Sequence, residues 1–329
     1  GPSMRHIFII NPLAGQKGRQ RKTEDAIRNA GRKLRLEPEI YRTTHAGDGE
    51  RFARQVCEES EGKEPLRFYA CGGDGLLNEV VNGVYGFFNA EVGCGPLGTG
   101  NDYVRNYGLP EDFLDIEAQL SASAAESDVI CYTVQTKGKK DAPRCCINMF
   151  NIGFDCNVVD QTARAKNWPL IKGSAAYLLS VAIILIKKKG ANLKVCYKDG
   201  SVFDGKLLLI AVANGCFCGG GVKGVPLAKT DDGKMDVSLV RNVSRRTFIR
   251  MFPKYAKGIH LSEPSLSHVI DYRKCDRLEI FANGSPMRLC TDGEITDAQQ
   301  VSFEIAPKAI RFLVPKGAGS RQNGRAKGE

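Results

Sequence analysis

Hydrophobic and polar positions follow two different patterns along this chain. The first third repeats one unit: a short apolar run, a loop rich in glycine or polar residues, and a longer segment with helical spacing. The predicted strands are 7–10, 39–42 and 66–71, and the predicted helices are 20–36, 50–59 and 76–84. Strand and helix repeated in this order predict an α/β domain, in which helices cover a parallel sheet.

The pattern changes after about residue 126. Short β-like runs at 129–136, 193–197, 207–213, 235–240 and 278–282 are separated by Gly, Asp and Asn turns, and helices are predicted at 175–186 and 246–257. A last strand, 309–314, follows Pro307. We therefore expect an N-terminal domain, 4–126, completed by about 305–316, a mostly β domain, 127–304, and a disordered basic tail, 317–329.

Composition narrows the class of protein. The chain has 329 residues and a net charge of +10, which suits nucleotide phosphates, acidic lipids or nucleic acid. Because the basic residues show no helix-turn-helix or aromatic stacking pattern, no nucleic-acid partner is expected. The longest apolar run, 175–186, is shorter than the roughly 20 residues of a membrane span. The 12 scattered cysteines contain no CxxC pair, as in a cytoplasmic protein with reduced thiols.

Two glycine loops carry the candidate phosphate chemistry of the first domain. Gly72-Gly73-Asp74-Gly75 lies between a predicted strand and a helix, where backbone N–H groups can approach phosphate oxygens. Asp74 would repel phosphate unless a metal is present, which suggests Mg²⁺; the alternative is a tight turn with an Asp cap. The second loop, 96–102, contains Thr99 and Asp102 and again precedes a predicted helix. It could also be a capped glycine turn.

Known nucleotide motifs do not explain these loops. A Gly-x-Gly-x-x-Gly string occurs at 93–98, but Pro96 and the glycine turn at 98–100 do not fit a dinucleotide site. No Gly-Lys pair is followed by Ser or Thr, so a Walker A loop is absent from the sequence.

The second domain adds two acidic turns. Asp231-Asp232-Gly233 could hold a cation through Asp232 and neighbouring carbonyls, or could be a loop leading into a strand. Asp292-Gly293-Glu294 places two carboxylates around a glycine. Such a pair can accept the proton of an attacking hydroxyl, or can simply form a turn.

Taken together, these elements resemble the catalytic-domain family of diacylglycerol kinases in its soluble bacterial form, which is related to sphingosine and ceramide kinases. The resemblance runs in family order through 11–15, 72–79, 98–102, 151–155, 214–221, 231–236 and 292–294. It implies a first domain like that of NAD kinases and phosphofructokinases, with ATP in the cleft between the two domains.

The resemblance also implies roles for individual residues. Asp74 and Asp102 would organise the catalytic Mg²⁺, and Glu294 or Asp292 would be the catalytic base. Asp232, with the backbone carbonyls of Lys229 and Lys234, would hold a structural Mg²⁺. The implied ATP-binding residues are Asn11, Pro12, Leu13, Ala14, Gly15, Thr43, Gly72, Gly73, Asp74, Gly75, Leu76, Leu77, Asn78 and Thr99.

The expected function is therefore an ATP- and Mg²⁺-dependent lipid kinase that phosphorylates a neutral lipid, with diacylglycerol as the first candidate. Alternatives are a kinase of a sphingoid lipid or phosphatidylglycerol, an NAD kinase, and a non-catalytic nucleotide- or lipid-binding regulator. We expect a cytoplasmic protein in peripheral contact with the membrane. The helix 175–186, with its basic flanks, could make this contact or be buried. Relatives suggest a homodimer.

One position departs from the family pattern. Leu76 stands where the family usually has Thr after the Gly-Gly-Asp-Gly string. We expect the loss of this hydroxyl to weaken nucleotide contact without inactivating the enzyme.

Overall fold

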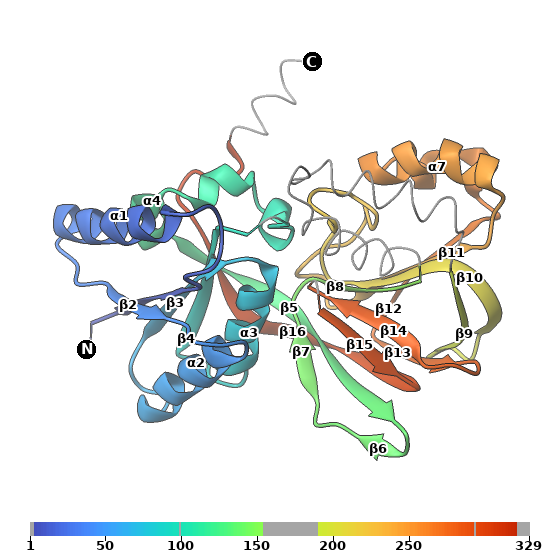
Figure 1. Ribbon diagram of the computed structural model, residues 1–329, viewed down its shortest axis with the longest axis horizontal. Helices are drawn as coiled ribbons and strands as arrows, with labels where there is room; N and C mark the ends of the chain where they lie inside the picture. The colour runs from blue at the N-terminus through green and yellow to red at the C-terminus, as the bar shows by residue number, and fades with distance from the viewer. Residues whose placement is uncertain (1–2, 99, 154–189, 293, 321–329) are drawn as a thin grey trace. The chain divides into compact units, whose positions relative to one another are not determined.

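The computed structural model describes residues 3–98, 100–153, 190–292 and 294–320. The chain divides into two compact units, called here unit 1 (Gly1–Ser127 with Lys308–Glu329) and unit 2 (Asp128–Pro307). Two strands belong to both units: β5 (Ser123–Thr136) and β16 (Gln300–Val314) (Figure 1). Unit 1 is therefore discontinuous in sequence, since its second part, which begins at Lys308 within β16, follows unit 2.

Unit 1 contains a parallel sheet in the order β2-β1-β3-β4-β16. Its strands are β1 (Arg5–Ile10), β2 (Glu39–Arg42), β3 (Leu66–Gly72), β4 (Ala90–Pro96) and the end of β16. β3 and β4 are buried along almost their whole length, as expected for the centre of a sheet with both faces covered.

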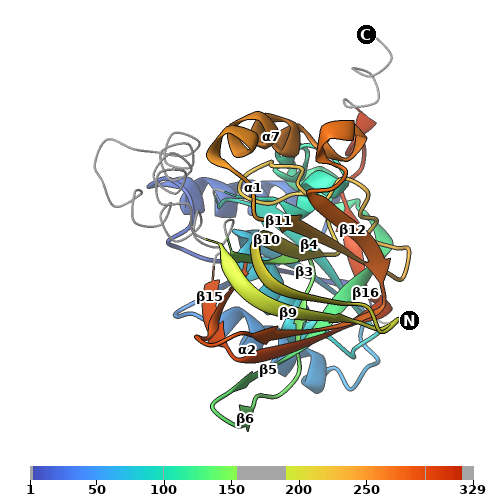
Figure 2. The ribbon, with the colours of Figure 1, turned by 90° about the vertical axis from the view of Figure 1, so that its right-hand side faces the viewer.

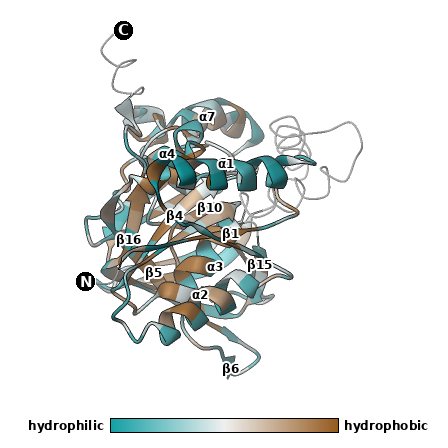
Figure 3. Cartoon of the chain, turned by 90° about the vertical axis from the view of Figure 1, so that its left-hand side faces the viewer, coloured by the Kyte–Doolittle hydropathy of each residue, from teal (hydrophilic) through white to brown (hydrophobic). Residues whose placement is uncertain are grey.

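Helices cover both faces of this sheet. The helices are α1 (Arg19–Leu34), α2 (Asp48–Glu59), α3 (Asp74–Val84) and α4 (Ile116–Leu120), with 3₁₀ turns at Tyr103–Asn106 and Pro110–Phe113. Figure 3 shows α1 and α4 on one face, and α2 and α3 on the other. Ile27 and Ala30 of α1 pack against Phe8, Ile10 and Tyr69 of the sheet. The predicted α/β first domain is confirmed.

Unit 2 is mostly antiparallel β structure, in the order β15-β14-β8-β10-β9-β13-β16, with β11 between β10 and β12. Its strands are β6 (Lys139–Lys140), β7 (Arg144–Cys146), β8 (Met149–Gly153), β9 (Ala191–Tyr197), β10 (Val202–Ala213), β11 (Met235–Arg241), β12 (Ile270–Cys275), β13 (Arg277–Ala282), β14 (Met287–Thr291) and β15 (Glu294–Ala298). One helix, α7 (Arg245–Lys257), and 3₁₀ turns at His260–Ser262 and Pro264–Leu266 complete its described part.

Two hydrophobic clusters stabilise unit 2. One fills the space around Phe150, Val212, Ile280 and Phe303, which come from four different strands. The other lies between the β10–β11–β12 region and the inner face of α7. The sheet therefore buries apolar side chains on both faces, and the predicted mostly β second domain is confirmed.

The last strand is longer than the sequence predicted. β16 runs from Gln300 to Val314 and continues through Pro307, with Lys308 at φ 50°. The sequence predicted a strand at 309–314, after Pro307. The ladder with β13 includes Glu304 and the ladder with β4 includes Phe312. Pro307 lies between them, where the strand changes its partner.

Two other expectations fall wholly or partly outside the residues that the structure describes. The predicted helix 175–186 lies outside them. Of the tail predicted to be disordered, 317–319 form a turn, and the Gly319 N–H donates to Asp112 Oδ2 at 3.4 Å; 321–329 lie outside the described residues. Within the described residues, no helix combines the length and the apolar character needed to span a membrane.

Candidate functional site

Four polar loops meet at one edge of the unit 1 sheet. Residues 11–15 follow β1, Thr43 follows β2, 73–75 follow β3, and the described residues 97–98 and 100–102 follow β4. Because these strands are parallel, all four loops leave the same carboxyl-terminal edge. Ligands of open α/β sheets bind at this edge, and most of the predicted ATP-binding residues of this chain lie there.

Backbone hydrogen bonds join the loops in the order of the strands. The N–H of Thr43 donates to Ile10 O at 2.9 Å, and that of Asn11 donates to Cys71 O at 3.1 Å. Leu97 and Gly98 both donate to the carbonyl of Gly72, at 2.9 and 3.1 Å. The start of each loop is thus held by the strand beside it.

The first loop turns sharply before α1. Asn11 Oδ1 accepts the N–H of Leu13 at 3.0 Å, which closes a local turn, and Gly15 has φ +78°. The side chain of Leu13 is 91% exposed. The N-cap position of α1 is Gly18, which has no capping side chain. The N-terminal N–H groups of α1 are therefore not satisfied by a side-chain cap and favour an anion.

The two glycine loops are in direct backbone contact. A Cβ added at Gly98 would lie 2.5 Å from the Cα of Gly73 and 3.1 Å from its nitrogen. Any side chain at Gly98 would therefore separate the loops that follow β3 and β4.

Asp74 ties the same two loops together. It is the first residue of α3, and its carboxylate accepts the N–H of Asp102 at 3.0 and 3.1 Å and that of Tyr103 at 3.4 Å. The carboxylate therefore caps the 3₁₀ turn that begins at Tyr103. Burial raises the pKa of Asp74, although these N–H donors and the charge of Arg105 act in the opposite direction.

The last strand of the chain supports this capped turn. The ring of Phe312, on β16, lies 4.9 Å from the ring of Tyr103 and 4.9 Å from that of Tyr107. Phe312 is fully buried. Aromatic packing between distant parts of the sequence therefore fixes the N–H groups that Asp74 binds.

The carboxylates of Asp102 and Asp74 both face the backbone at Gly100. A Cβ added at Gly100 would lie 2.8 Å from Asp74 Oδ2 and 3.3 Å from Asp102 Oδ2. Asp102 is buried, and Arg105 Nε lies 3.6 Å from its Oδ1. Carboxylate oxygens are suitable ligands for Mg²⁺, which usually takes one or two of them together with water and substrate phosphates. The two aspartates fit that role. In the described parts of the chain, no three His, Cys, Asp or Glu residues form a metal-binding group.

After Asp74, the next side chains of α3 belong to the core. Leu76 and Leu77 are buried. Leu76 fills the space beside Gly49, where an added Cβ would meet its Cδ1 at 2.7 Å, and beside Gly72. Leucine at this position therefore belongs to the core between α2 and α3. Asn78 is half-buried, and Thr99 lies outside the described residues.

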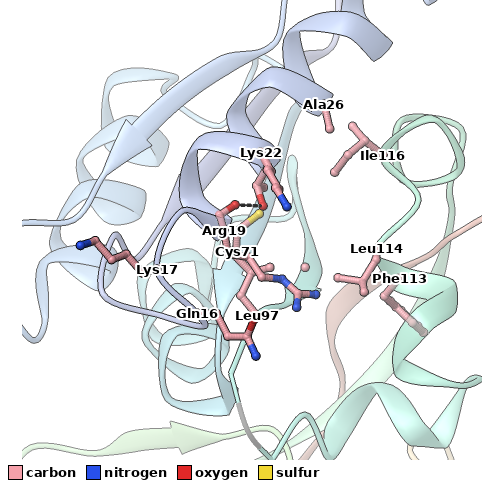
Figure 4. A pocket seen from close by; sticks show the side chains of 12 residues that line it. Gln16, Lys17, Arg19, Lys22, Ala26, Cys71, Leu97, Phe113, Leu114 and Ile116 are labelled. Atoms are coloured by element: carbon pink, nitrogen blue, oxygen red, sulfur yellow. Dashed lines mark hydrogen bonds between the residues drawn. The ribbon is translucent and has the colours of Figure 1, made fainter.

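A cavity beside the first loop was not predicted from the sequence. Its volume is about 380 Å³. Figure 4 shows polar and basic side chains of the loop and α1 on one side, and apolar side chains on the other. The charges of Lys17, Arg19 and Lys22 suit phosphate oxygens. Basic residues directly after a glycine turn were the available signal. The lining residues are Gln16, Lys17, Arg19, Lys22, Thr23, Ala26, Cys71, Gly95, Leu97, Phe113, Leu114 and Ile116.

In unit 2, a lysine occupies the predicted structural metal site. Lys274 Nζ lies 2.8 Å from Asp232 Oδ2, 2.9 Å from Asp236 Oδ1 and 2.9 Å from the carbonyl of Leu227. Asp232 Oδ1 accepts the N–H of Lys234 at 3.1 Å. Both oxygens of Asp232 therefore already have protein partners, and a divalent cation would have to share them with the Lys274 ammonium.

Asp292 and Glu294 face different environments. Asp292 follows β14 and has φ 49°; Glu294, at the start of β15, pairs with Thr291. Asp292 Oδ2 is buried, whereas the Glu294 side chain is exposed. Burial, and after it the charge of Asp292, raises the pKa of the Cys146 thiol well above its ordinary value. Oδ2 of the half-buried Asp292 is therefore enclosed, whereas the Glu294 side chain is exposed to solvent.

Comparison with known proteins shows that two family models match this chain, one in each half. Residues 5–132 match the family model described as diacylglycerol kinase catalytic domain, and 148–314 match the YegS C-terminal NAD kinase beta sandwich-like domain. The chain is 27% identical over 315 residues to a probable YegS-like lipid kinase of Chromohalobacter salexigens. This alignment covers 94% of this chain and 93% of the relative. It is also 27% identical over 316 residues to a diacylglycerol kinase of Bacillus subtilis, in an alignment that covers 95% of this chain and 97% of that relative.

Solved structures share the fold. A putative diacylglycerol kinase from Bacillus anthracis superposes with a TM-score of 0.69 at 23% identity, over 95% of this chain and 98% of that one. A second Bacillus anthracis structure, described as a diacylglycerol kinase, gives 0.66 at 20% identity over the same shares.

Proposed function

Since this chain belongs to the family of diacylglycerol kinases and YegS-like lipid kinases and is itself a lipid kinase that uses ATP, we propose that it phosphorylates diacylglycerol in a Mg²⁺-dependent reaction. The product would be phosphatidic acid. The enzyme would reach its substrate from the cytoplasmic side, as a peripheral protein at the membrane surface.

The bond between Asp74 and the loop at 102–103 is the observation that best supports this proposal. It ties the two glycine loops together, with Gly98 against Gly73. Phosphoryl transfer needs little covalent help from a protein, so positioning and electrostatic stabilisation of the phosphoryl oxygens dominate. The loops at 11–15, 72–78 and 97–102 would supply the N–H groups that position ATP.

Mg²⁺, when bound with ATP, would neutralise charge on the transferring phosphoryl group. Asp74 and Asp102 would orient it, since both carboxylates face the backbone at Gly100. The three basic side chains beside the first loop, Lys17, Arg19 and Lys22, would contact phosphate oxygens. A structural Mg²⁺ at Asp232, with the carbonyls of Lys229 and Lys234, is a further proposal, and it requires Lys274 to share the carboxylate.

We assign the general base to Glu294 rather than Asp292. The acceptor hydroxyl comes from a lipid, so the group that takes its proton must be accessible. The Glu294 side chain is exposed at the start of β15, whereas Oδ2 of Asp292 is buried. Asp292 would instead fix the tight hairpin that carries Glu294.

The test is transfer of label from Mg-ATP to lipids in mixed micelles. The panel contains diacylglycerol, monoacylglycerol, ceramide, sphingosine and phosphatidylglycerol, with NAD in a separate reaction. Asp74→Ala and Glu294→Gln are the test variants. Asp297→Asn is the matched control, because Asp297 is an exposed carboxylate on the same strand as Glu294.

Label on diacylglycerol that is lost in both test variants and retained in Asp297→Asn would support the proposal. Label on another lipid would overturn the proposed acceptor, and label on NAD alone would move the chain to nucleotide phosphorylation. Full activity of Glu294→Gln would refute the assignment of the base.

A further inference from the structure

The helix α7 has an unusual charge distribution. Its 13 residues include five basic side chains and no acidic one. Its inner face buries Phe248, Met251 and Tyr255 against the β10–β11–β12 region. Figures 1 and 2 show α7 along one end of unit 2. One side of α7 is therefore fixed to the core, and its other side forms part of the surface of unit 2.

The outer side of α7 forms a single stripe, which we call the α7 face. It consists of Arg246, Ile249, Arg250, Pro253 and Lys257, all of which are exposed. Their spacing of three and four residues places them on one side of a helix. An aliphatic side chain, Ile249, lies between the basic ones and is 57% exposed. A second isoleucine, Ile259, follows the helix and is 50% exposed.

The α7 face is held rigidly. Ser244 caps the helix by accepting the N–H of Thr247 at 3.2 Å. Lys223 N donates to the carbonyl of Ala256 at 3.0 Å. Tyr255 packs so closely on Gly224 that an added Cβ there would lie 2.5 Å from its hydroxyl. A partner that binds this face would therefore not need to order it first.

The charges of the α7 face are not neutralised by the neighbouring described residues. Lys254, beside the stripe, pairs with Glu263 at 2.5 Å. In contrast, Arg246, Arg250 and Lys257 form no ion pair with any acidic side chain that the structure describes. Three positive charges around an exposed isoleucine suit a partner that is anionic at its surface and apolar beneath it.

We propose that the α7 face docks on an anionic membrane surface. Arg246, Arg250 and Lys257 would contact lipid phosphates, and Ile249 would enter the boundary between headgroups and acyl chains. This inference rests on the proposed function, because a lipid kinase must reach a substrate that lies in a membrane. It differs from the contact predicted at 175–186, which lies outside the described residues.

A membrane fits this face better than nucleic acid does. The phosphate backbone of a duplex would attract the three basic side chains equally well. A phosphate backbone offers no apolar environment for Ile249, which is exposed at the centre of the stripe. The interfacial region of a bilayer does accept an aliphatic side chain.

The experiment measures sedimentation of the full-length protein with sucrose-loaded vesicles in the absence of ATP. One set of vesicles contains equal parts phosphatidylglycerol and phosphatidylcholine, and the other contains phosphatidylcholine alone. Arg246→Glu/Arg250→Glu is the test variant. Lys139→Glu/Lys140→Glu is the matched control, since it changes the net charge equally at exposed positions of β6, at the other end of unit 2 from α7 (Figures 1 and 2).

The expected result is binding of the wild type to the anionic vesicles only. The test variant should bind at least about 25-fold more weakly, since each basic side chain near an anionic surface contributes about fivefold. The control variant should bind like the wild type. Ile249→Ser should weaken binding by about tenfold without changing its dependence on salt. Equal loss in the test and control variants would overturn the proposal, as would a higher affinity for duplex DNA than for the vesicles.

A kinase assay separates this inference from the proposed function. With short-chain diacylglycerol dispersed as monomers, the test variant should match the wild type; with diacylglycerol in anionic vesicles, it should be slower. Vesicle binding through α7 without kinase activity on any lipid would refute the function and leave the docking surface. Kinase activity with vesicle binding unchanged in the test variant would refute the docking surface alone.

Discussion

Replacing Gly98 with alanine tests whether close contact between the two glycine loops builds the proposed nucleotide site. The added Cβ would lie 2.5 Å from the Cα of Gly73, whereas ordinary contact begins near 3.4 Å. The obstacle is backbone, which cannot rotate away as a side chain can. The two loops would therefore have to move apart by about 1 Å to restore normal carbon–carbon contact.

Two effects of Gly98→Ala can be estimated. Overpacking of this kind costs about 1–3 kcal/mol of the free energy of unfolding, and urea denaturation would measure it. A displacement of about 1 Å at reacting groups can cost about 100-fold in rate, and kcat/KM for ATP would measure that.

Gly73→Ala is a control within the same contact. A Cβ at Gly73 would lie 3.7 Å from the Cα of Gly98, an ordinary distance, and the backbone of Gly73 is extended. Its free energy of unfolding should stay within about 0.5 kcal/mol of the wild type. If Gly98→Ala were as stable as Gly73→Ala, the close contact would not constrain the loops and the reasoning would be wrong.

Three further predictions follow from other contacts. Burial, and after it the charge of Arg67, lowers the pKa of His6 from 6.5 to about 4. The contribution of neutral His6 to the free energy of unfolding should be full above pH 6.5 and lost as the pH falls towards 4, because the unfolded chain binds the proton first. In urea denaturation, the free energy of unfolding of His6→Gln should depend less on pH than that of the wild type. Leu76→Thr should lower the free energy of unfolding by about 1–3 kcal/mol, because it empties buried space beside Gly49; an unchanged value would contradict the packing described. Lys274→Met should lower the thermal unfolding midpoint and make it rise on addition of Mg²⁺, because two carboxylates lose their cation; Lys198→Met, which removes an exposed pair of 3.1 Å, should do neither.

Local sequence signals predicted the elements better than their contacts. The strand at 39–42 has the predicted bounds, and the helices predicted from 50 and 76 begin two residues earlier, at Asp48 and Asp74. These elements are defined by neighbours in the sequence, such as a buried apolar run or a glycine turn. Propensity and periodicity act over this range.

Contacts between distant residues could not be predicted in the same way. Asp74 binds N–H groups 28 and 29 positions further along the chain, so the sequence showed an acid in a loop but not its partner. Lys274 reaches Asp232 only because β11 and β12 pair with Asp236 opposite Lys274. That register is fixed by the packing of a whole sheet rather than by local pattern.

The side-chain directions at the acidic hairpin were also not available from the sequence. Asp292 and Glu294 are two residues apart, and a regular strand would place them on the same face. Asp292 instead has a positive φ, and Oδ2 of its carboxylate is buried whereas the Glu294 side chain is exposed. A string of residue types does not show such a turn reliably, because other residues than glycine adopt positive φ only rarely.

The position of β16 in unit 1 has a consequence for how the protein is made. A ribosome releases β1 to β4 early, but the strand that covers the edge of β4, and the Phe312 ring that supports Tyr103, are synthesised only after all of unit 2. During translation the nascent sheet therefore exposes an unpaired edge, which is prone to aggregation. The 3₁₀ turn that begins at Tyr103 therefore gains its aromatic support only at the end of synthesis.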